Sequence, residues 1–412
     1  MKSLCLIVLF SLTTILGHEI TSYDFNVKID VKEKQIHVDG FTNIDFKDKD
    51  SLNLVLWKNA TIKEISSKGE ELKYNFDTSS GSPIMYIKEG RSLTVYRADN
   101  GKNMQAVKFI YDLDLNELNG WAVSFTEDWI KINFYSGWFP VNGVFISKFK
   151  IYIDENYIVT GSGVIEKKDG YWEMIQPWSS FDNVIIASKK LKSKILKDND
   201  VHIQTVYSNG DFSDADADTL LKESKYALGL FENYFGMKDS TYLKFVIAPF
   251  ERGGGYSRKN FICMRTLRFN RYTATKGIAH EIAHFWWLNA QTSSWEDWLN
   301  EAFAEYSMLL YIRERFGLEA FQKEIEDYKS RTQNLPPIWG IERNSNEAYS
   351  VLYEKGSVIL SGLEEKIGKD KFLDFLKNVS RNKIKITNDF LALMEDKLSE
   401  DTRNWFESRL KQ

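Results

Sequence analysis

The chain has 412 residues, of which 43% are hydrophobic and 27% are charged, and its formal net charge at pH 7 is −4. This composition is that of a folded protein with material for about two or three domains. Because the chain has no basic excess to neutralise a phosphate backbone, we expect no nucleic-acid partner.

The first segment, residues 1–17, combines Lys2 with an apolar run from Leu4 to Leu16. A charged start followed by a short apolar run predicts a signal peptide, and therefore an exported protein that is periplasmic or extracellular. The run is shorter than the roughly 20 residues that a membrane-spanning helix needs. We therefore expect no membrane span in the mature chain.

Residues 18–200 are expected to form a β-rich N-terminal domain, because apolar and polar residues alternate there with a period of two. The alternation is clearest in four segments, which are Tyr23–Val31, Ile36–Phe46, Ile130–Phe134 and Phe145–Ile153.

Residues 201–412 change to a helical period and are expected to form a second, mostly helical domain. The segment Thr219–Phe235 is amphipathic and is followed by Gly236, a residue that commonly ends helices. One strand is expected over Leu243–Pro249. Further helices are expected at about 275–289, 298–316, 350–366, 370–379 and 387–398.

The sharpest motif is the pentapeptide His280-Glu281-Ile282-Ala283-His284. Residues four apart return to nearly the same face of a helix, so the two imidazoles can hold one metal ion. Glu281 then lies close enough to act on a water molecule at that ion. The spacing therefore predicts a catalytic zinc site.

A catalytic zinc site needs a third protein ligand and one open position. The expected helix 298–316 offers two candidates four residues apart, Glu301 and Glu305. On spacing alone, either carboxylate could be the ligand.

Three ordered blocks of the sequence resemble the active-site blocks of the M1 family of zinc aminopeptidases. The blocks are His280–Trp286, Trp298–Tyr306 and Ala348–Gly356, and two looser matches in the first half are Tyr23-Asp24 and Tyr135–Pro140. The resemblance implies an α+β multidomain fold, in which a β-rich N-terminal domain precedes a thermolysin-like, mostly helical zinc-peptidase domain.

The resemblance also implies the roles of individual residues. One zinc ion per chain would be held by His280, His284 and Glu301. Glu281 would take the proton of the attacking water, and Tyr353 would donate a hydrogen bond to the developing oxyanion. Tyr349, one turn before Tyr353, is expected to assist in binding a peptide substrate.

The chain departs from the family pattern in the length of one loop. His284 and Glu301 are separated by 16 residues, two fewer than is usual in the family. Because the Trp-Leu-Asn-Glu block itself is intact, Glu301 is the expected third ligand, and Glu305 is the alternative.

A second departure concerns the segment Gly253-Gly254-Gly255-Tyr256, where the family usually carries a glutamate that holds the free α-amine of the substrate. We still expect these four residues to bind substrate, since glycines let a peptide backbone approach a strand edge closely. Glu251 and Glu127 are candidates for a replacement carboxylate.

The expected function is that of a zinc metallopeptidase, most simply an M1-like aminopeptidase that acts on peptides. One alternative is an endopeptidase or another hydrolase that uses the same zinc site, because the amine-binding glutamate is missing. The other is a non-catalytic peptide-binding protein that keeps a structural zinc.

Overall fold

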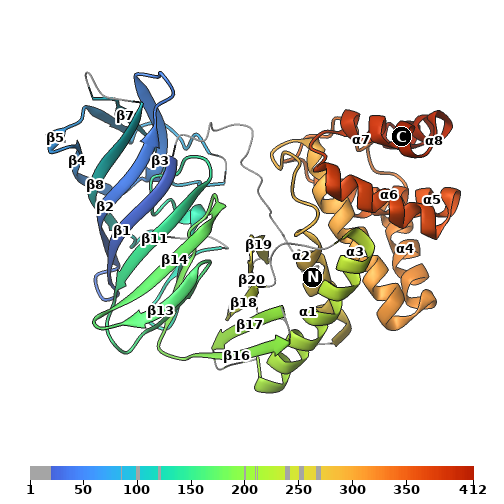
Figure 1. Cartoon of the computed structure of the whole chain (residues 1–412), viewed down its shortest axis with the longest axis horizontal. Coiled ribbons are helices and arrows are strands. Elements are labelled where there is room, and N and C mark those ends of the chain that lie inside the picture. Colours follow the sequence, from blue (N-terminus) through green and yellow to red (C-terminus); the bar gives the residue numbers. More distant parts are fainter. Residues whose placement is uncertain are drawn as a thin grey trace.

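A computed structural model describes most of the chain after the first 19 residues. The described residues are 20–84, 86–98, 103–118, 122–198, 201–208, 210, 212–236, 242–249, 255–265 and 271–412. The signal peptide expected at residues 1–17 lies outside them and stays a prediction. A β-rich half and a helical half lie at opposite ends of the molecule, with a small sheet between them (Figure 1).

The β-rich half consists of three sheets built from alternating sequences. In β1 (Ile20–Asp30), for example, Phe25, Val27 and Ile29 are buried while the residues between them are exposed. An eight-stranded sheet has the order β13-β14-β11-β1-β2-β8-β4-β5, beside a four-stranded sheet β12-β15-β10-β9 and a three-stranded sheet β3-β7-β6. The β-rich fold predicted for this half is confirmed.

The remaining strands of these sheets have the following bounds: β2 Gln35–Asp45, β3 Ser51–Trp57, β4 Ala60–Ser67, β5 Glu70–Glu71, β6 Tyr74–Asp77, β7 Gly90–Tyr96, β8 Met104–Asp114, β9 Ser124–Phe125, β10 Ile130–Ile132, β11 Phe145–Tyr152, β12 Ile158–Gly161, β13 Val164–Lys168, β14 Tyr171–Ser180 and β15 Ile185–Ser188. A short 3-10 helix, η1 (Phe134–Ser136), follows β10.

The central sheet has five strands in the order β16-β17-β18-β20-β19. Their bounds are β16 Leu191–Asp198, β17 Val201–Ser208, β18 Tyr242–Ala248, β19 Tyr256–Arg258 and β20 Phe261–Arg265. Strands β16 and β17 pair antiparallel, so the domain boundary expected at residue 200 falls between two strands of one sheet. Strand β19 pairs only with β20 and forms one edge of the described sheet.

Helices make up the rest of the second half. They are α1 Asp214–Phe235, α2 Arg271–Ala283, α3 Trp298–Phe316, α4 Leu318–Thr332, α5 Gly356–Ile367, α6 Lys369–Asn382, α7 Thr387–Lys397 and α8 Glu400–Leu410, with the 3-10 helix η2 Trp295–Asp297 and the π-helical segment η3 Ser350–Lys355. Helix α1 begins at a capping box in which Ser213 and Asp216 bond each other's backbone, and it is followed by Gly236.

The structure corrects two expectations about the helices. The helix expected at 275–289 is α2, which ends at Ala283, because the following residues turn inward. There the indole of Trp286 donates to the carbonyl of Gly236 at 2.9 Å, and that of Trp287 donates to the hydroxyl of Ser307 at 2.8 Å. Helices α4 and α8 had not been predicted at all.

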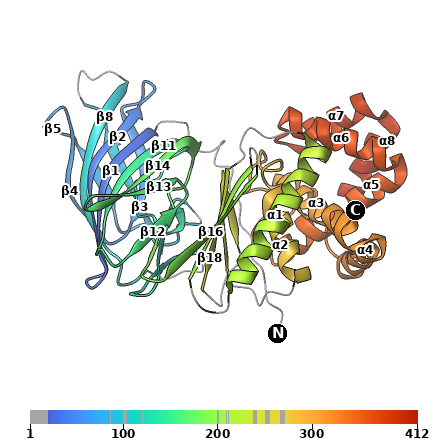
Figure 2. The ribbon, with the colours of Figure 1, turned by 60° about the horizontal axis from the view of Figure 1, so that its bottom comes forward.

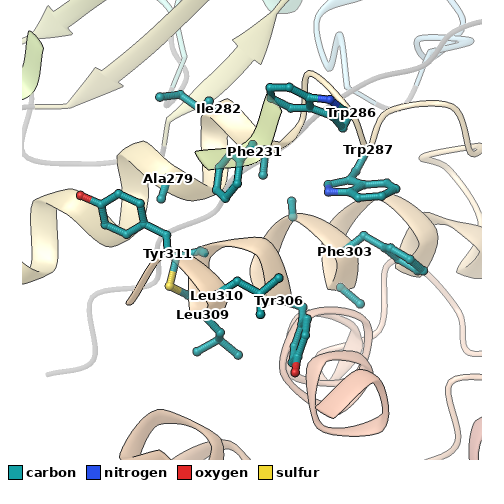
Figure 3. Packing of buried hydrophobic residues seen from close by; sticks show 14 of the residues in the cluster. Phe231, Ala279, Ile282, Trp286, Trp287, Phe303, Tyr306, Leu309, Leu310 and Tyr311 are labelled. Carbon is teal, nitrogen blue, oxygen red and sulfur yellow. The ribbon is translucent and has the colours of Figure 1, made fainter. Parts of the chain in front are cut away.

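Helices α2 and α3 cross in the centre of the helical core. One buried apolar cluster contains Ala279 and Ile282 of α2, Leu309 and Leu310 of α3 and Phe231 of α1 (Figure 3). The helices that hold the metal-binding motif are therefore anchored in a large apolar core, which fixes their relative position.

Buried polar contacts join the two halves where the small sheet meets the β-rich half (Figure 2). Arg258 of β19 pairs with Asp182 at 2.7 Å, and both side chains are almost fully buried. The ammonium group of Lys244 donates to the carbonyls of Gly161 and Gly163 at 2.9 and 2.8 Å. The β-rich half is thus tied to the sheet that borders helix α2.

Candidate active site

The motif histidines lie at the C-terminal end of α2. His280 and His284 are 2% and 0% exposed, and the amide of His284 still donates to the carbonyl of His280 at 3.4 Å. The last helical turn therefore extends to His284, and the Nε2 atoms of the two imidazoles lie 3.1 Å apart. The spacing of four residues has placed both rings on one face, as the sequence predicted.

Glu301, in the first turn of α3, completes a cluster with the two histidines. Its Oε2 atom lies 3.5 Å from Nε2 of His280 and 3.3 Å from Nε2 of His284. The ligand atoms of the three residues all lie within 4.8 Å of one another. Two imidazole nitrogens and a buried carboxylate turned toward one point are the donor set of a catalytic zinc site, so these residues fit that ion.

Glu305 contacts the other side of His280. Its Oε2 atom is 2.6 Å from Nδ1 of His280, and its Oε1 atom accepts a hydrogen bond from the hydroxyl of Tyr328. The Nδ1 atom of His284 lies 3.0 Å from the carbonyl of Trp287. Such partners fix the orientation of metal-binding imidazoles and leave Nε2 for the ion. Glu305 is therefore placed to orient His280 rather than to serve as the third ligand.

Asn300 connects the short loop after α2 to the start of α3. Its side chain accepts from the amide of Ala290 and donates to the carbonyl of Ala290, both at 3.1 Å, and it also donates to Asp297 at 2.9 Å. These bonds set the position of Glu301 despite the shortened loop. Asp297 in turn accepts from Arg343 at 2.8 Å.

Glu281 is buried beside the cluster, and within the described part of the chain neither of its carboxylate oxygens has a hydrogen-bond partner. Burial raises its pKa to about 7, although the nearby His284 and His280 oppose the shift. A carboxylate with a pKa near neutrality is suited to accept and release a proton. The two free oxygens and the raised pKa are the properties expected of a general base.

Hydrogen bonds and charges within the cluster shift the pKa values of His280 and Glu301. Burial opposes a charge on His280, but hydrogen bonds to Glu301 and Glu305 outweigh it and raise the pKa of His280 to about 10. Burial likewise opposes the charge on Glu301, while His284 and His280 lower the pKa of this carboxyl to about 2. The carboxylate of Glu301 is therefore negative beside the protonated imidazole of His280, an arrangement in which a bound cation replaces the proton.

Tyr353 lies in the π-helical segment η3, beside the cluster formed by His280, His284 and Glu301. Its ring is parallel to that of His280 at 5.9 Å and stacks on Tyr349 at 4.4 Å. Burial raises the pKa of Tyr353 well above its ordinary value, so the hydroxyl keeps its proton. Gly356 lets this segment approach α3, because a Cβ atom there would lie 2.5 Å from that of Ala302.

The structure describes part of the glycine-rich segment. Gly253, Gly254 and Glu251 lie outside the described residues. Gly255 lies against Glu281, because a Cβ atom on Gly255 would come within 3.1 Å of Glu281 Oε1. The hydroxyl of Tyr256 accepts a hydrogen bond from Asn133 at 3.0 Å, so this residue packs between the two halves of the chain.

Glu127, the other candidate for a replacement carboxylate, forms an ion pair with Lys189 at 2.7 Å and is 78% exposed. Four residues of the site region were not singled out from the sequence, and they are Tyr86, Tyr135, Arg258 and Arg343. Electrostatic interactions link Tyr135 and Arg258 to Glu281, and Tyr86 and Arg343 to Glu301. Tyr135 begins the looser family match Tyr135–Pro140, whereas no local pattern marks Tyr86, Arg258 or Arg343, which reach the site through the tertiary fold.

Comparisons with known proteins agree with this geometry. The glutamyl aminopeptidase of Bos taurus is 30% identical over 203 residues, which are 42% of this chain and 21% of the relative. Endoplasmic reticulum aminopeptidase 2 of Bos taurus is 27% identical over 209 residues, which are 45% of this chain and 21% of the relative. The aligned regions thus span about a fifth of these relatives.

The fold has a solved counterpart over nearly its whole length. The crystal structure of an M1 zinc metallopeptidase from Deinococcus radiodurans superposes with a TM-score of 0.74 at 17% identity and covers 96% of this chain and 95% of that one. The α+β fold, with a β-rich domain followed by a mostly helical domain, is thereby confirmed.

The cluster of two histidines and a glutamate can hold a metal ion. Residues 265–408 match the model of the Peptidase family M1 domain. Within the described part of the chain, no helix has both the length and the apolar character needed to cross a membrane.

Proposed function

We propose that the protein is a zinc metallopeptidase of the aminopeptidase type. The observation that carries the proposal is the meeting of three ligand atoms from His280, His284 and Glu301 beside the unpartnered carboxylate of Glu281. Support comes from the M1 family domain and from relatives that are named aminopeptidases. A mutant of the M1 zinc metallopeptidase from Deinococcus radiodurans has been solved with the substrate Tyr-Ser-Ala bound, and a mutant of a two-domain M1 zinc metallopeptidase has been solved with L-arginine bound.

Each residue of the site has a different role in the proposed hydrolysis of a peptide bond. A zinc ion held by His280, His284 and Glu301 supplies Lewis acidity, which polarises a carbonyl group and acidifies a water molecule. Glu281 accepts the proton of the attacking water and can pass it to the leaving amine. Tyr353 keeps its proton and donates a hydrogen bond where the carbonyl oxygen becomes negative.

A peptide substrate would bind with its backbone along the sheet edge that strand β19 forms. Strand β19 forms an edge of the central sheet, and Gly255 precedes it beside Glu281. An extended peptide can add to such an edge through main-chain hydrogen bonds. We therefore keep Gly253, Gly254, Gly255 and Tyr349 as proposed substrate-binding residues, while Tyr256 would act by holding β19 against the β-rich half.

Metal analysis tests the assignment of the ligands. We expect about one zinc per chain after reconstitution, because two imidazoles and a carboxylate match zinc better than magnesium or calcium. His284→Ala should lose the metal, since it removes one of three protein ligands, while His202→Ala should keep it. Less than about half an equivalent in the wild type, or full zinc in His284→Ala, would contradict the site.

The second candidate function is that of an endopeptidase or another hydrolase that uses the same zinc site. The pairing of the nearby acidic groups with arginines favours this function. Asp182 is paired with Arg258 and Asp297 with Arg343, so these carboxylates are not available for a substrate ammonium. We expect only a weak preference for a free N-terminus, below about a thousandfold in kcat/KM relative to the acetylated peptide. A larger preference would show that a strong amine site exists and would favour the strict aminopeptidase.

A structural zinc in a non-catalytic peptide-binding protein is the remaining alternative. Wild-type protein loaded with zinc should hydrolyse a mixture of short peptides, and a chelator should stop the reaction. Metal-loaded protein that binds peptides but does not cleave them would favour the binding protein instead.

A further inference from the structure

A cavity of about 420 Å³ lies between the β-rich half and the central sheet. One wall comes from strands β12, β13 and β14, and the other comes from β16, β17 and β18. Its volume is in the range of small-molecule sites, which often form where two parts of a chain meet. The residues that line it include neither Glu281 nor any of the three proposed zinc ligands. The cavity is therefore a different site from the zinc site.

One end of the cavity carries a buried ammonium group. The Nζ atom of Lys244 donates to the carbonyls of Gly161 and Gly163 at 2.9 and 2.8 Å. Gly161 is the last residue of β12, and Gly163 directly precedes β13. Their neighbours Thr160 and Val164, like Lys244 itself, line the cavity. The ammonium group therefore lies beside the turn between β12 and β13, at the edge of the cavity.

This ammonium group has no carboxylate beside it in the part of the chain that the structure describes. Lys244 is 3% exposed, and no aspartate or glutamate is among the described residues that line the cavity. Burial lowers the pKa of Lys244 to about 7, because the charge is held away from water without an opposite charge. An ammonium group has three N–H donors, and the two carbonyls use two of them. One donor is left for an anion, which would also stabilise the charged form.

Aliphatic side chains form the opposite end of the cavity. Ile158, Val164 and Ile195 line it and are 41%, 45% and 51% exposed. Large apolar side chains that gather in this way at the surface are typical of a site that binds an apolar group.

The strand register relates the aliphatic end to the ammonium group. Ile195 of β16 pairs with Gln204 of β17, and Gln204 pairs with Lys244 of β18, so the three residues lie in one row across the sheet. Neighbouring strands are about 4.8 Å apart, which places the two ends of this row about 10 Å from each other. A ligand that satisfies both ends therefore has an anionic group joined to an apolar chain.

We propose that this cavity binds an aliphatic carboxylate, with the carboxylate group at the ammonium of Lys244 and the hydrocarbon chain toward Ile195. A medium-chain fatty acid has this chemistry, because its only charged group is at one end. A free amino acid does not have it, since its own ammonium group would lie close to Lys244 and to Lys192, which also lines the cavity. The inference does not depend on the proposed peptidase function.

Calorimetry on the zinc-loaded wild type tests the proposal by comparing octanoate with octanamide, which has the same chain and no charge. We expect octanoate to bind at least about tenfold more tightly, the difference that a charge-assisted hydrogen bond supplies. Lys244→Met should reduce this difference below about twofold, because methionine keeps a long unbranched side chain without the ammonium group. Equal affinity of the wild type for the two compounds, or no binding of octanoate, would overturn the proposal.

A second variant decides the question if Lys244→Met does not fold. Ile195→Glu puts a negative charge on a half-exposed position, so it should leave the fold intact and weaken octanoate binding by about tenfold. Ile146→Glu is the matched control, because Ile146 is 44% exposed on β11 and is not among the lining residues. It should leave the affinity for octanoate unchanged.

Binding of octanoate to the zinc ion is the competing explanation, since zinc also binds carboxylates. Such binding would have the same affinity in the wild type, in Lys244→Met and in Ile195→Glu. That result would overturn the proposed site.

Discussion

Glu281→Gln is expected to keep one zinc per chain and to lose peptide hydrolysis by a factor of about 10² to 10⁴ in kcat. The amide has nearly the size of the carboxylate, and Gly255 leaves room for it beside the strand edge. It cannot accept the proton of the attacking water, however. Among the described residues Glu281 has no hydrogen-bond partner, so the substitution breaks none of the described bonds that hold α2 in place.

The matched control for this substitution is Glu364→Gln. Glu364 is also largely buried in the helical half, where it bonds Tyr306 and Arg313, far from the zinc ligands in sequence. Its replacement should lower stability while kcat stays within about twofold of the wild type. Hydrolysis at the wild-type rate by Glu281→Gln, with zinc content and thermal unfolding unchanged, would remove Glu281 from the mechanism.

The metal ligands His280 and His284 could be predicted from the sequence because their geometry depends only on neighbouring residues. A separation of four residues places His280 and His284 on one helical face whatever the rest of the fold does. Period-two alternation likewise identified the first strands, since one face of each strand is buried. The choice of Glu301 over Glu305 as the third ligand needed the resemblance to the family. The two residues are four apart and lie on the same face of the helix, so spacing alone does not separate them.

The parts that the sequence did not reveal depend on contacts between distant segments. Glu305 orients His280 only because α2 and α3 cross at a particular angle in the apolar core. Arg343 reaches Asp297 across 46 positions of the chain, and Arg258 reaches Asp182 across 76. The early end of α2 follows from the inward turn of Trp286 and Trp287, whose indoles find partners on other elements.

Tyr353→Phe is expected to keep the zinc ion and to lower kcat by about 10² to 10³ with little change in KM, the cost of removing one oxyanion donor. The ring that packs against Tyr349 and faces His280 is retained, so packing of the π-helical segment should survive. Because burial holds the pKa of Tyr353 well above its ordinary value, the hydroxyl donates throughout the neutral range. The loss should therefore be the same at pH 6.5 and pH 8.5, about the width of a usual assay window.

A buried tyrosine outside the site separates the oxyanion role from a general effect of losing a hydroxyl group. Tyr311→Phe removes a hydroxyl that donates to Glu223 at 2.5 Å, and it should change kcat by less than about twofold. If Tyr353→Phe instead raised KM while kcat remained at the wild-type value, Tyr353 would bind the ground state of the substrate rather than its transition state. Stabilisation of the oxyanion would then have to come from another donor, and the half-buried guanidinium of Arg343 would be the first to test.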